Sequence, residues 1–463
     1  MDNSAIDLVP MDTRVQMNYI EFLDNSPVNK QLWLILIGVL MANLLDGMSV
    51  MMTSFAMPGI IREFKINSAL AGGIFSAATL GLALGALFLP LLSDRIGRKP
   101  VFQWMILLFA FGSFLSAIAT SYNAMILARF IAGVGLGAEI PIGIAAVVEY
   151  SPVRLRHIFL PLITVASSVG FIVAALLSIW LIPAFGWRSI FWVGVAPALV
   201  AIYVGKFMPE SIRFLLARGQ TEKAGEIAHA IARSAGLANI ELVPPVMTAN
   251  QPKPTFMRQV SLLRPMWIAT VLLTACFFCS VLQTFGVNSW LPTIFIRQGF
   301  KLTSSFNYTL LIFIVTPLSH MIAMWLMSKM SRRSALFVMA TVGTVCFFLF
   351  GLSFEYRWPV YVLVGSQVVQ TLFGPGVMAV LYTFSAEVFP TSVRGVGLGL
   401  ITGLGRFGAV VGPFLLGLSL QWGAKVSEVM YLFAAPLFAA ALLVVIFLTV
   451  DTRRMALDNV PAG

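Results

Sequence analysis

The sequence predicts an all-α polytopic membrane protein with twelve transmembrane helices in two six-helix repeats. Of its 463 residues, 59% are hydrophobic and 11% are charged, whereas a soluble chain carries about 25% charged residues. Uncharged apolar runs near the length of about 20 residues that crosses a bilayer recur along the whole chain. In addition, two pairs of loops resemble each other about half a chain apart.

Twelve apolar segments are long enough to be membrane spans. They lie at residues 32–56, 70–92, 101–119, 124–149, 158–182, 187–207, 266–296, 308–328, 334–352, 359–386, 395–420 and 429–450. If both termini lie on one side, that side collects 21 of the 30 Lys and Arg residues and the other side collects 7. Because cytoplasmic loops carry the excess of basic residues, we expect a multi-pass plasma (cytoplasmic) membrane protein with cytoplasmic termini. The net charge of +11 then reflects topology and not nucleic-acid binding.

The repeated loops divide the chain in two. LSDRIGRKPVF is similar to MSKMSRRSALF, and the distance from Asp94 to Ser328 is 234 positions. EYSPVRLR is similar to EVFPTSVRG, and the distance from Glu149 to Glu387 is 238 positions. We therefore expect an N-terminal cytoplasmic tail, a six-helix bundle, a cytoplasmic linker, a second six-helix bundle and a cytoplasmic tail, at residues 1–31, 32–207, 208–265, 266–450 and 451–463. Helical spacing in EKAGEIAHAIARSAG (222–236) predicts a short amphipathic helix in the linker.

Asp46 is the first charge inside a span. An ionised carboxylate at bilayer depth costs at least roughly 3 kcal/mol, so it usually faces a partner or a water-filled path. Asp46 lies about 15 residues into the first span, and Arg129 about five residues into the fourth, which enters from the opposite side. The two are expected to form a pair that opens when the carboxylate is protonated; a permanent structural ion pair is the alternative.

Two further ionisable residues lie inside spans. Glu139 follows Arg129 by ten residues and points about 80° away from it, so it is a candidate second proton site or substrate contact, or else a helix-packing residue. Arg406 has no nearby acid in sequence, and its planar fork suits a carboxylate. It is the candidate for binding a substrate anion, with a structural contact to backbone carbonyls as the alternative. The repeat partner of Arg129, at an offset of 238, is Gln367.

The seventh span contributes polar candidates. The amides of Gln283 and Asn288 could orient a polar substituent, and Trp290 could stack on a ring. In the eighth span His320 could carry a proton, although a histidine at a helix contact is the more ordinary interpretation. Cys276 and Cys279 form a CxxC on an apolar helix without a second ligand pair, which favours packing over metal binding.

LSDRIGRKP resembles the loop motif of the major facilitator superfamily, in which Asp94, Arg95, Gly97, Arg98 and Lys99 match and Pro90 replaces the leading Gly. RFIAGVGLGAEIP and FMPESIRFLLARG match further segments of that superfamily, and Gly133 and Gly137 are spaced for close helix packing. SWLPTIFIRQGF and GLGRFGAVVGP are most similar to aromatic acid/proton symporters, and GAEIP to nicotinate-type carriers. Many of these symporters have a second Asp where this chain has Ser49. The resemblance covers roughly residues 32–450.

The resemblance implies the major facilitator fold and proton-coupled uptake of a small, aromatic or heteroaromatic carboxylate by alternating access. Together with the residues discussed above, we expect proton coupling at Asp46, Arg129 and Glu139, and substrate binding at Arg406, Gln283, Asn288, Trp290, Ser49 and Glu139. Gating falls to Asp94, Arg95, Arg98, Glu149, Glu387 and Arg394. A sugar or polyol porter, an efflux antiporter and a non-transporting membrane sensor are the alternatives. We expect a monomer in the bilayer whose partners are the substrate and protons, with no metal, cofactor, nucleic acid or catalytic site.

Overall fold

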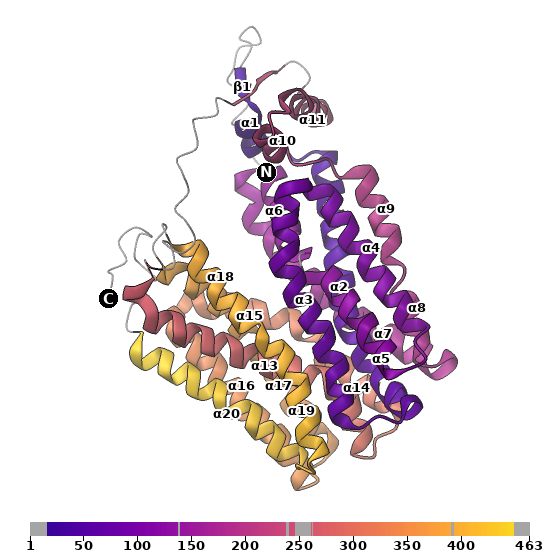
Figure 1. Cartoon of the computed structure of the whole chain (residues 1–463). Coiled ribbons are helices and arrows are strands. Elements are labelled where there is room, and N and C mark those ends of the chain that lie inside the picture. The colour runs from indigo at the N-terminus through magenta and orange to yellow at the C-terminus, as the bar shows by residue number, and fades with distance from the viewer. Residues whose placement is uncertain are drawn as a thin grey trace.

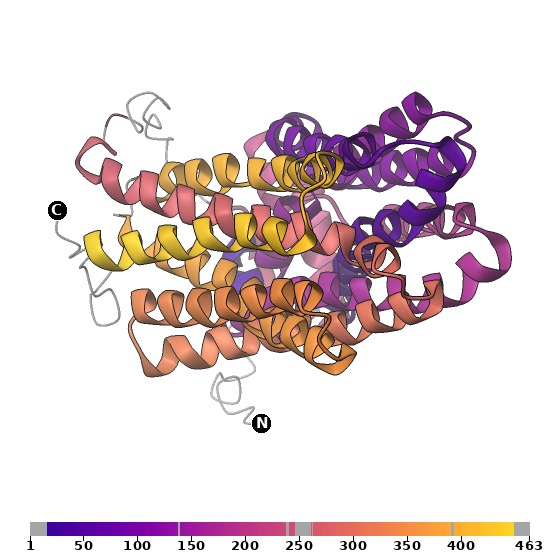
Figure 2. The same ribbon diagram turned by 90° about the horizontal axis from the view of Figure 1, so that it is seen from below.

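The computed structural model describes residues 16–137, 139–237, 240–245, 261, 263–389 and 393–448. Within these ranges, twelve helical segments are long and apolar enough to cross a membrane, which confirms the predicted number. Figure 1 shows them as two groups of long helices, coloured indigo to magenta and salmon to yellow. Seen from below in Figure 2, the two groups lie side by side.

The N-terminal group contains α2–α9. Its spans are α2 (Lys30–Phe64), α3 (Ser68–Ile96), α4 (Arg98–Ala117), α5 (Tyr122–Gly137) with α6 (Glu139–Tyr150), α7 (Val153–Phe185), and α8 (Arg188–Val193) with α9 (Pro197–Phe207). Asparagine caps start the first two of these helices: Asn29 accepts a hydrogen bond from Leu32 N and Asn67 one from Leu70 N, both 2.9 Å long. These bonds satisfy backbone donors that lack partners at a helix start.

The C-terminal group contains the other six spans. They are α13 (Trp267–Arg297) preceded by the short helix η1 (Arg264–Met266), α14 (Leu302–Ile314) with α15 (Thr316–Lys329), α16 (Arg332–Glu355), α17 (Val360–Val388), α18 (Arg394–Gly405) with α19 (Phe407–Gln421), and α20 (Val426–Phe447). Two interruptions have a proline in the first turn of the second piece, Pro197 in α9 and Pro317 in α15, since proline suits a helix start. Another interruption falls at Arg406.

Close packing between α3 and α5 depends on glycine. A Cβ atom on Gly133 would collide with the carbonyl oxygen of Ala78, and one on Gly137 with that of Leu82. The predicted close contact at these two glycines is therefore confirmed. Backbone surfaces without side chains allow helices to approach closely inside a membrane.

The two groups meet at the end of the molecule opposite the 208–265 segment. There Ser54 of α2 donates to Asn288 O (3.1 Å) or Ser289 O (2.7 Å) of α13. Arg297 at the end of α13 donates to Ser68 Oγ at 2.5 Å. Figure 1 shows the groups diverging from this contact toward the other end.

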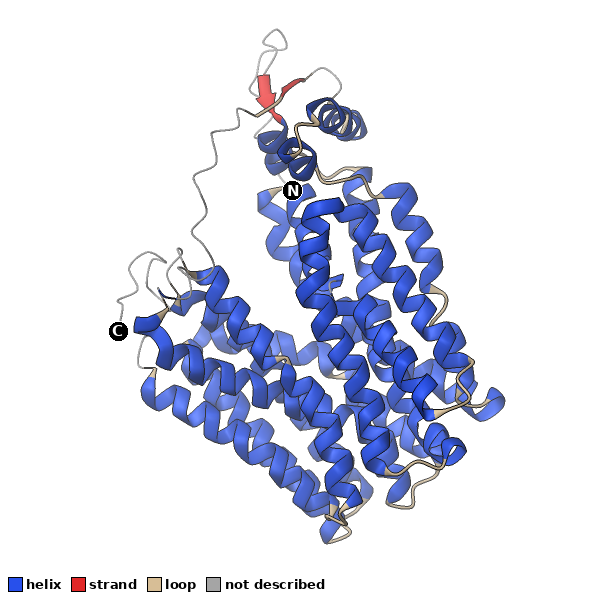
Figure 3. Cartoon of the chain, in the orientation of Figure 1, coloured by secondary structure: helices blue, strands red, loops and turns tan. Residues whose placement is uncertain are grey.

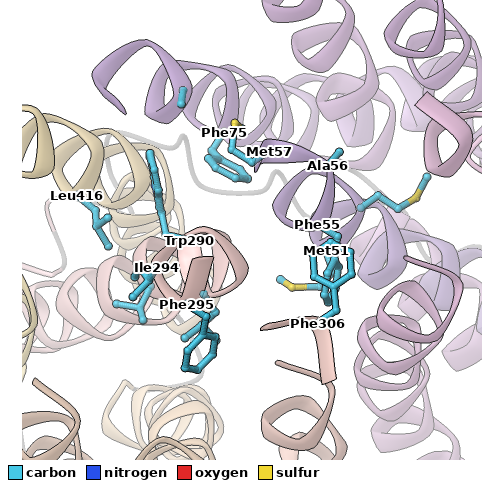
Figure 4. Packing of buried hydrophobic residues seen from close by; sticks show 14 of the residues in the cluster. Met51, Phe55, Ala56, Met57, Phe75, Trp290, Ile294, Phe295, Phe306 and Leu416 are labelled. Carbon is cyan, nitrogen blue, oxygen red and sulfur yellow. The ribbon is translucent and has the colours of Figure 1, made fainter. Parts of the chain in front are cut away.

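Apolar side chains fill the contact between the groups. The rings of Phe55 and Phe306 lie 5.0 Å apart, and those of Phe75 and Trp290 lie 6.0 Å apart. Figure 4 shows these residues where α2 and α3 approach α13, α14 and α19. We call this region the far-end contact.

The opposite end carries a small additional layer on the N-terminal group. It consists of β1 (Gln16–Asn18), α1 (Tyr19–Asn25), α10 (Ile212–Ala217), α11 (Thr221–Ser234) and β2 (Glu241–Val243). β1 and β2 pair in parallel, with Gln16 opposite Glu241 (Figure 3). α11 confirms the amphipathic helix predicted at 222–236, whereas the strand pair has no counterpart among the predictions.

Candidate functional site

Three ionisable residues form a cluster between the two groups of helices, which we call the central charge cluster: Asp46, Glu139 and Arg406. Asp46 is 7% exposed, and one of its carboxylate oxygens has no hydrogen-bond partner. The cation that acts electrostatically on Asp46 is Arg406, at the junction of α18 and α19 in the other group. Its guanidinium makes no hydrogen bond or ion pair with the residues that the structure describes.

Glu139 extends the cluster. It opens α6, is 3% exposed, and has one carboxylate oxygen without a partner. Asp46 acts on it electrostatically. One turn further along α6, a Cβ atom on Gly143 would lie 2.9 Å from Val39 Cγ1 of α2, so α6 packs against the part of α2 that carries Asp46. Two buried carboxyl groups thus share a site with one guanidinium, an arrangement that suits the binding of protons and of an anion.

Arg129 is not part of this cluster, and the expected Asp46–Arg129 pair is absent. Arg129 is 1% exposed, and its Nε donates to Ser116 Oγ at 2.8 Å. Its other nitrogens donate to Thr53 Oγ1 and Gly112 O, both at 3.4 Å, and its guanidinium lies 4.7 Å from the ring centroid of Phe191.

The depths of Asp46 and Arg129 along their helices explain why the two side chains do not pair. α2 continues to Phe64, eight residues beyond the predicted end at 56, so Asp46 lies 18 residues, or about 27 Å, from that end. Arg129 lies only seven residues, or about 10 Å, from the start of α5 on the same side. The two charges are therefore at different depths, and Arg129 meets α2 at Thr53.

A polar cavity lies inside the C-terminal group, and we call it the amide pocket. Its lining comes from α13, α16 and α17: Gln283, Thr284, Val287, Asn288, Phe347, Gln367, Gln370, Thr371 and Pro375. Gln283 and Asn288, the two amides expected to orient a polar substituent, thus both line this pocket. Gln283 is 1% exposed and its Nε2 has no partner.

Trp290 does not reach this pocket. It is fully buried, and its Nε1 donates to Pro413 O at 3.1 Å in the far-end contact. Stacking on a substrate ring, as predicted, is therefore wrong for this arrangement, because both faces of the side chain are enclosed by packing. Ser49 is also buried on α2, and His320 lies with Nδ1 3.4 Å from Thr316 O of its own helix, which favours the helix-contact interpretation.

The loop that resembles the superfamily motif is held by two glutamates. Arg98 Nη1 donates to Glu149 Oε2 at 2.6 Å, and Glu149 also accepts from Ser211 Oγ and Arg213 N. Glu210 Oε1 accepts from Arg98 N at 2.9 Å. Gly97 has φ +120°, and a Cβ atom there would collide with Glu210, so this position needs glycine.

The second half repeats the ion pair. Arg332 donates to Glu387 over 2.9 to 3.1 Å through two nitrogens. Arg98 and Arg332 are 234 positions apart, and Glu149 and Glu387 are 238 apart, which are the offsets of the loop repeat. Each half therefore has the same type of Arg–Glu ion pair at the end that carries its repeated loops.

Two of the remaining gating candidates, Asp94 and Arg95, take no part in the ion pairs seen among the described residues. Asp94 and Arg95 are exposed, and Arg95 O accepts a hydrogen bond from Arg218. The ion pairs Arg98–Glu149, Arg156–Asp24, Arg188–Glu63, Arg332–Glu387 and Lys425–Glu355 each lie within one half. The side chain of Arg394 lies outside the described residues.

Several residues of these sites escaped the sequence reasoning. The amides Gln367 and Gln370 line the pocket, and Glu210 fixes the motif loop. Polar side chains in the apolar segment 359–386 were a usable signal by the same argument that singled out Asp46. Gln367 was in addition the repeat partner of Arg129.

Comparisons with known proteins agree with this architecture. The family described as "Sugar (and other) transporter" matches residues 29–462. A niacin transporter of Acinetobacter baylyi is 28% identical over 449 residues, covering 96% of this chain and 100% of that protein. A gallate transporter of Pseudomonas putida is also 28% identical, covering 94% and 95%, and a 4-hydroxybenzoate transporter of Acinetobacter baylyi is 27% identical, covering 91% and 92%.

Among solved structures, the xylose transporter of E. coli in a partially occluded inward-open conformation superposes with a TM-score of 0.70. It is 16% identical, and the match covers 92% of this chain and 99% of that one. At this identity the similarity concerns the fold, which is that of the major facilitator superfamily.

Proposed function

Since the chain belongs to the sugar (and other) transporter family, we propose that it imports a small aromatic or heteroaromatic carboxylate together with protons. The observation that carries the proposal is Arg406, a guanidinium without hydrogen-bond or ion-pair partners among the described residues, which acts electrostatically on the buried Asp46. Niacin, gallate and 4-hydroxybenzoate, which the relatives carry, each combine an aromatic ring with a carboxylate. A free guanidinium is the group that binds a carboxylate in two parallel hydrogen bonds.

The coupling follows from competition for Arg406. While Asp46 is ionised, it neutralises the guanidinium and opposes the entry of a second carboxylate. Protonation of Asp46 releases Arg406 for the substrate, so proton and substrate bind together. By thermodynamic linkage, bound substrate strengthens proton binding by the same factor. Glu139, next to Asp46, is the second group that can hold a proton in the cluster.

The direction of opening identifies the stage of the transport cycle. The positive-inside rule places the end that carries α10 and α11 in the cytoplasm. The far-end contact then closes the external side, and the arrangement corresponds to an inward-facing state. In an importer, such a state releases the substrate into the cytoplasm.

A sugar porter is the other candidate, favoured by the family description and by the PESIRFLLARG segment. A neutral sugar offers no counter-charge to Arg406. The loop arginines Arg98 and Arg332, in contrast, already pair with Glu149 and Glu387. The carboxylate is therefore preferred over the sugar.

Substrate binding as a function of pH tests the proposal. Affinity of purified protein for nicotinate, benzoate, 4-hydroxybenzoate and xylose is measured by thermal shift and calorimetry from mildly acidic to mildly alkaline buffer. Affinity for an acid should fall as the pH rises, because Asp46 loses its proton and occupies Arg406. Asp46→Asn should bind the acid tightly across the whole range.

Variants at Arg406 separate charge from geometry. Loss of charged hydrogen bonds contributing roughly 1.5–3 kcal/mol weakens binding about tenfold or more, in Arg406→Lys and further in Arg406→Ala. Arg357→Lys, at an exposed loop position, is the matched control and should bind as wild type. Tight binding of xylose with no binding of any acid would reject the carboxylate, and pH-independent affinity in wild type would reject the coupling.

A further inference from the structure

A second cavity lies on the N-terminal group, beside the loop that resembles the superfamily motif, and we call it the linker cavity. Its walls come from the end of α3, from α10 and from α11, at the end of the molecule where the two groups diverge (Figure 1). Its volume is about 510 Å³, which is within the range of small-molecule sites, about 300–1,000 Å³. None of its lining residues belongs to the central charge cluster or to the amide pocket.

Three basic side chains line the linker cavity: Arg95, Arg218 and Lys223. All three are exposed, and none takes part in the ion pairs seen among the described residues. Arg218 is held in place, since it donates to Arg95 O and its guanidinium lies 5.4 Å from the ring centroid of Phe214. The charged ends of Arg95 and Lys223, and the other N–H groups of Arg218, are therefore available to a ligand.

Two acidic side chains line the cavity as well, Glu210 and Glu226. Glu210 is committed to the motif loop, because its Oε1 accepts from Arg98 N at 2.9 Å and from Ser211 N at 2.8 Å. Glu226 lies three residues after Lys223 on α11, so the two are neighbours on the helix surface and Glu226 competes with any anion for that ammonium. Three cations and one uncommitted acid leave the cavity with a surplus of positive charge.

The first turn of α11 adds hydrogen-bond donors. Gln220 and Lys223, from the start of this helix, both line the cavity. Gln220 occupies the N-cap position, and its side chain makes no capping hydrogen bond. The first backbone N–H groups of α11 therefore lack the partner that a capping side chain supplies, and the positive end of the helix dipole favours an anion there.

We infer that the linker cavity binds a phosphate-bearing molecule. Phosphate oxygens accept hydrogen bonds from guanidinium, ammonium and backbone N–H groups, which are the three kinds of donor assembled here. Phe214, Leu215 and Ile227 form apolar parts of the wall, and the cavity is far larger than one phosphate group, so an organic part has room as well. The phosphate belongs either to a soluble anion or to a lipid headgroup. The inference goes beyond the proposed function and does not depend on the transported substrate.

Binding of adenosine triphosphate and of pyrophosphate to the full chain in detergent tests the soluble source. Calorimetry without divalent cations should show saturable binding that weakens as the chloride concentration is raised. Lys223→Gln is the first variant, because the Lys223 side chain makes no hydrogen bond or ion pair with the described residues. It should weaken binding roughly two- to fivefold, as expected for the loss of an exposed charge pair.

Glu226→Gln provides a test that a folding defect does not imitate. Removal of the competing carboxylate should strengthen binding of the same phosphates roughly two- to fivefold. Arg233→Gln, at an exposed position in the last turn of the same helix, is the matched control and should bind as wild type.

Native mass spectrometry tests the lipid source. Protein extracted from bilayers of phosphatidylcholine and phosphatidylglycerol is examined for retained phosphatidylglycerol. Retention that Lys223→Gln lowers and Glu226→Gln raises assigns the site to a lipid headgroup, whereas the same pattern for the soluble phosphates alone assigns it to a soluble anion. Absence of saturable binding in both experiments, or binding that both substitutions leave unchanged, overturns the inference. Neither result bears on the proposed function, since nicotinate and benzoate binding is measured separately.

Discussion

Ser54→Ala should favour opening of the far-end contact. The size of this effect depends on a backbone carbonyl of α13 that a proline leaves without its usual hydrogen-bond donor. Residue 292 of α13 is proline, so Asn288 O lacks the backbone N–H that would bind it four residues on. Ser54 Oγ, fully buried on α2, lies 3.1 Å from this carbonyl and 2.7 Å from Ser289 O, so its single proton is shared between the two acceptors. Alanine would leave the Asn288 carbonyl buried and unpaired as long as the two halves stay in contact.

The cost is that of an unsatisfied buried acceptor, about 1–3 kcal/mol. It applies only while the far end is closed, because water reaches the carbonyl once the halves separate there. The equilibrium between the closed and open far end should therefore shift toward the open form by about 5- to 150-fold. In the proposed orientation, this is a shift from inward-facing to outward-facing protein.

Distance measurements between spin labels report the shift. Labels at Lys65 and Gln298, exposed positions on the two halves at the far end, are introduced after replacing the three native cysteines. Ser54→Ala should increase the population at long distance. Ser419→Ala is the matched control, since Ser419 donates within its own helix to Leu415 O at 2.8 Å. An unchanged distribution in Ser54→Ala, or an equal change in the control, would refute the reasoning.

Three further predictions concern stability and are checked by thermal unfolding in detergent. Gly97→Ala should lower the unfolding midpoint by several degrees, because it combines strain at φ +120° with a collision at Glu210; an unchanged midpoint would contradict the glycine requirement. Arg129→Gln should be strongly destabilising through the lost hydrogen bonds, while any substrate binding that remains keeps its pH dependence; loss of that dependence would return Arg129 to the coupling site. Trp290→Phe should cost about 1 kcal/mol, the contribution of one neutral hydrogen bond to Pro413 O, with substrate selectivity unchanged; altered selectivity would place Trp290 at the substrate.

The architecture was predictable because hydropathy and repeats are local patterns. The ion pairs Arg98–Glu149 and Arg332–Glu387 follow the two offsets read from the sequence. A pair between Asp46 and Arg129 was a different kind of prediction, since it required the depth of each residue. The depth of Asp46 is measured from the end of α2. That end could not be read from hydropathy, because α2 continues beyond its most apolar part.

Contacts between distant helices were the part that local patterns could not supply. The electrostatic interaction between Asp46 and Arg406 depends on how the two halves face each other. The periodicity of the sequence carries no information about that arrangement. The contact in which Gln367 Nε2 donates to Gln370 Oε1 at 3.0 Å depends on how the two side chains are packed inside the C-terminal group. Composition identified the segments that carry such groups, but not the pairing among them.

The strand pair β1–β2 has a consequence for synthesis of the chain. Gln16 pairs with Glu241, 225 positions later, so β1 has no partner until the whole N-terminal group and α11 have left the ribosome. Tyr19, Phe22 and Leu23 of α1 are buried in the same cluster as Ala228 and Leu242. A nascent chain that stops before α11 therefore exposes this apolar surface, although its six spans are complete. The first half is therefore complete only after the linker has been synthesised. A chaperone or protease would reach α1 before that point and would be excluded from it afterwards.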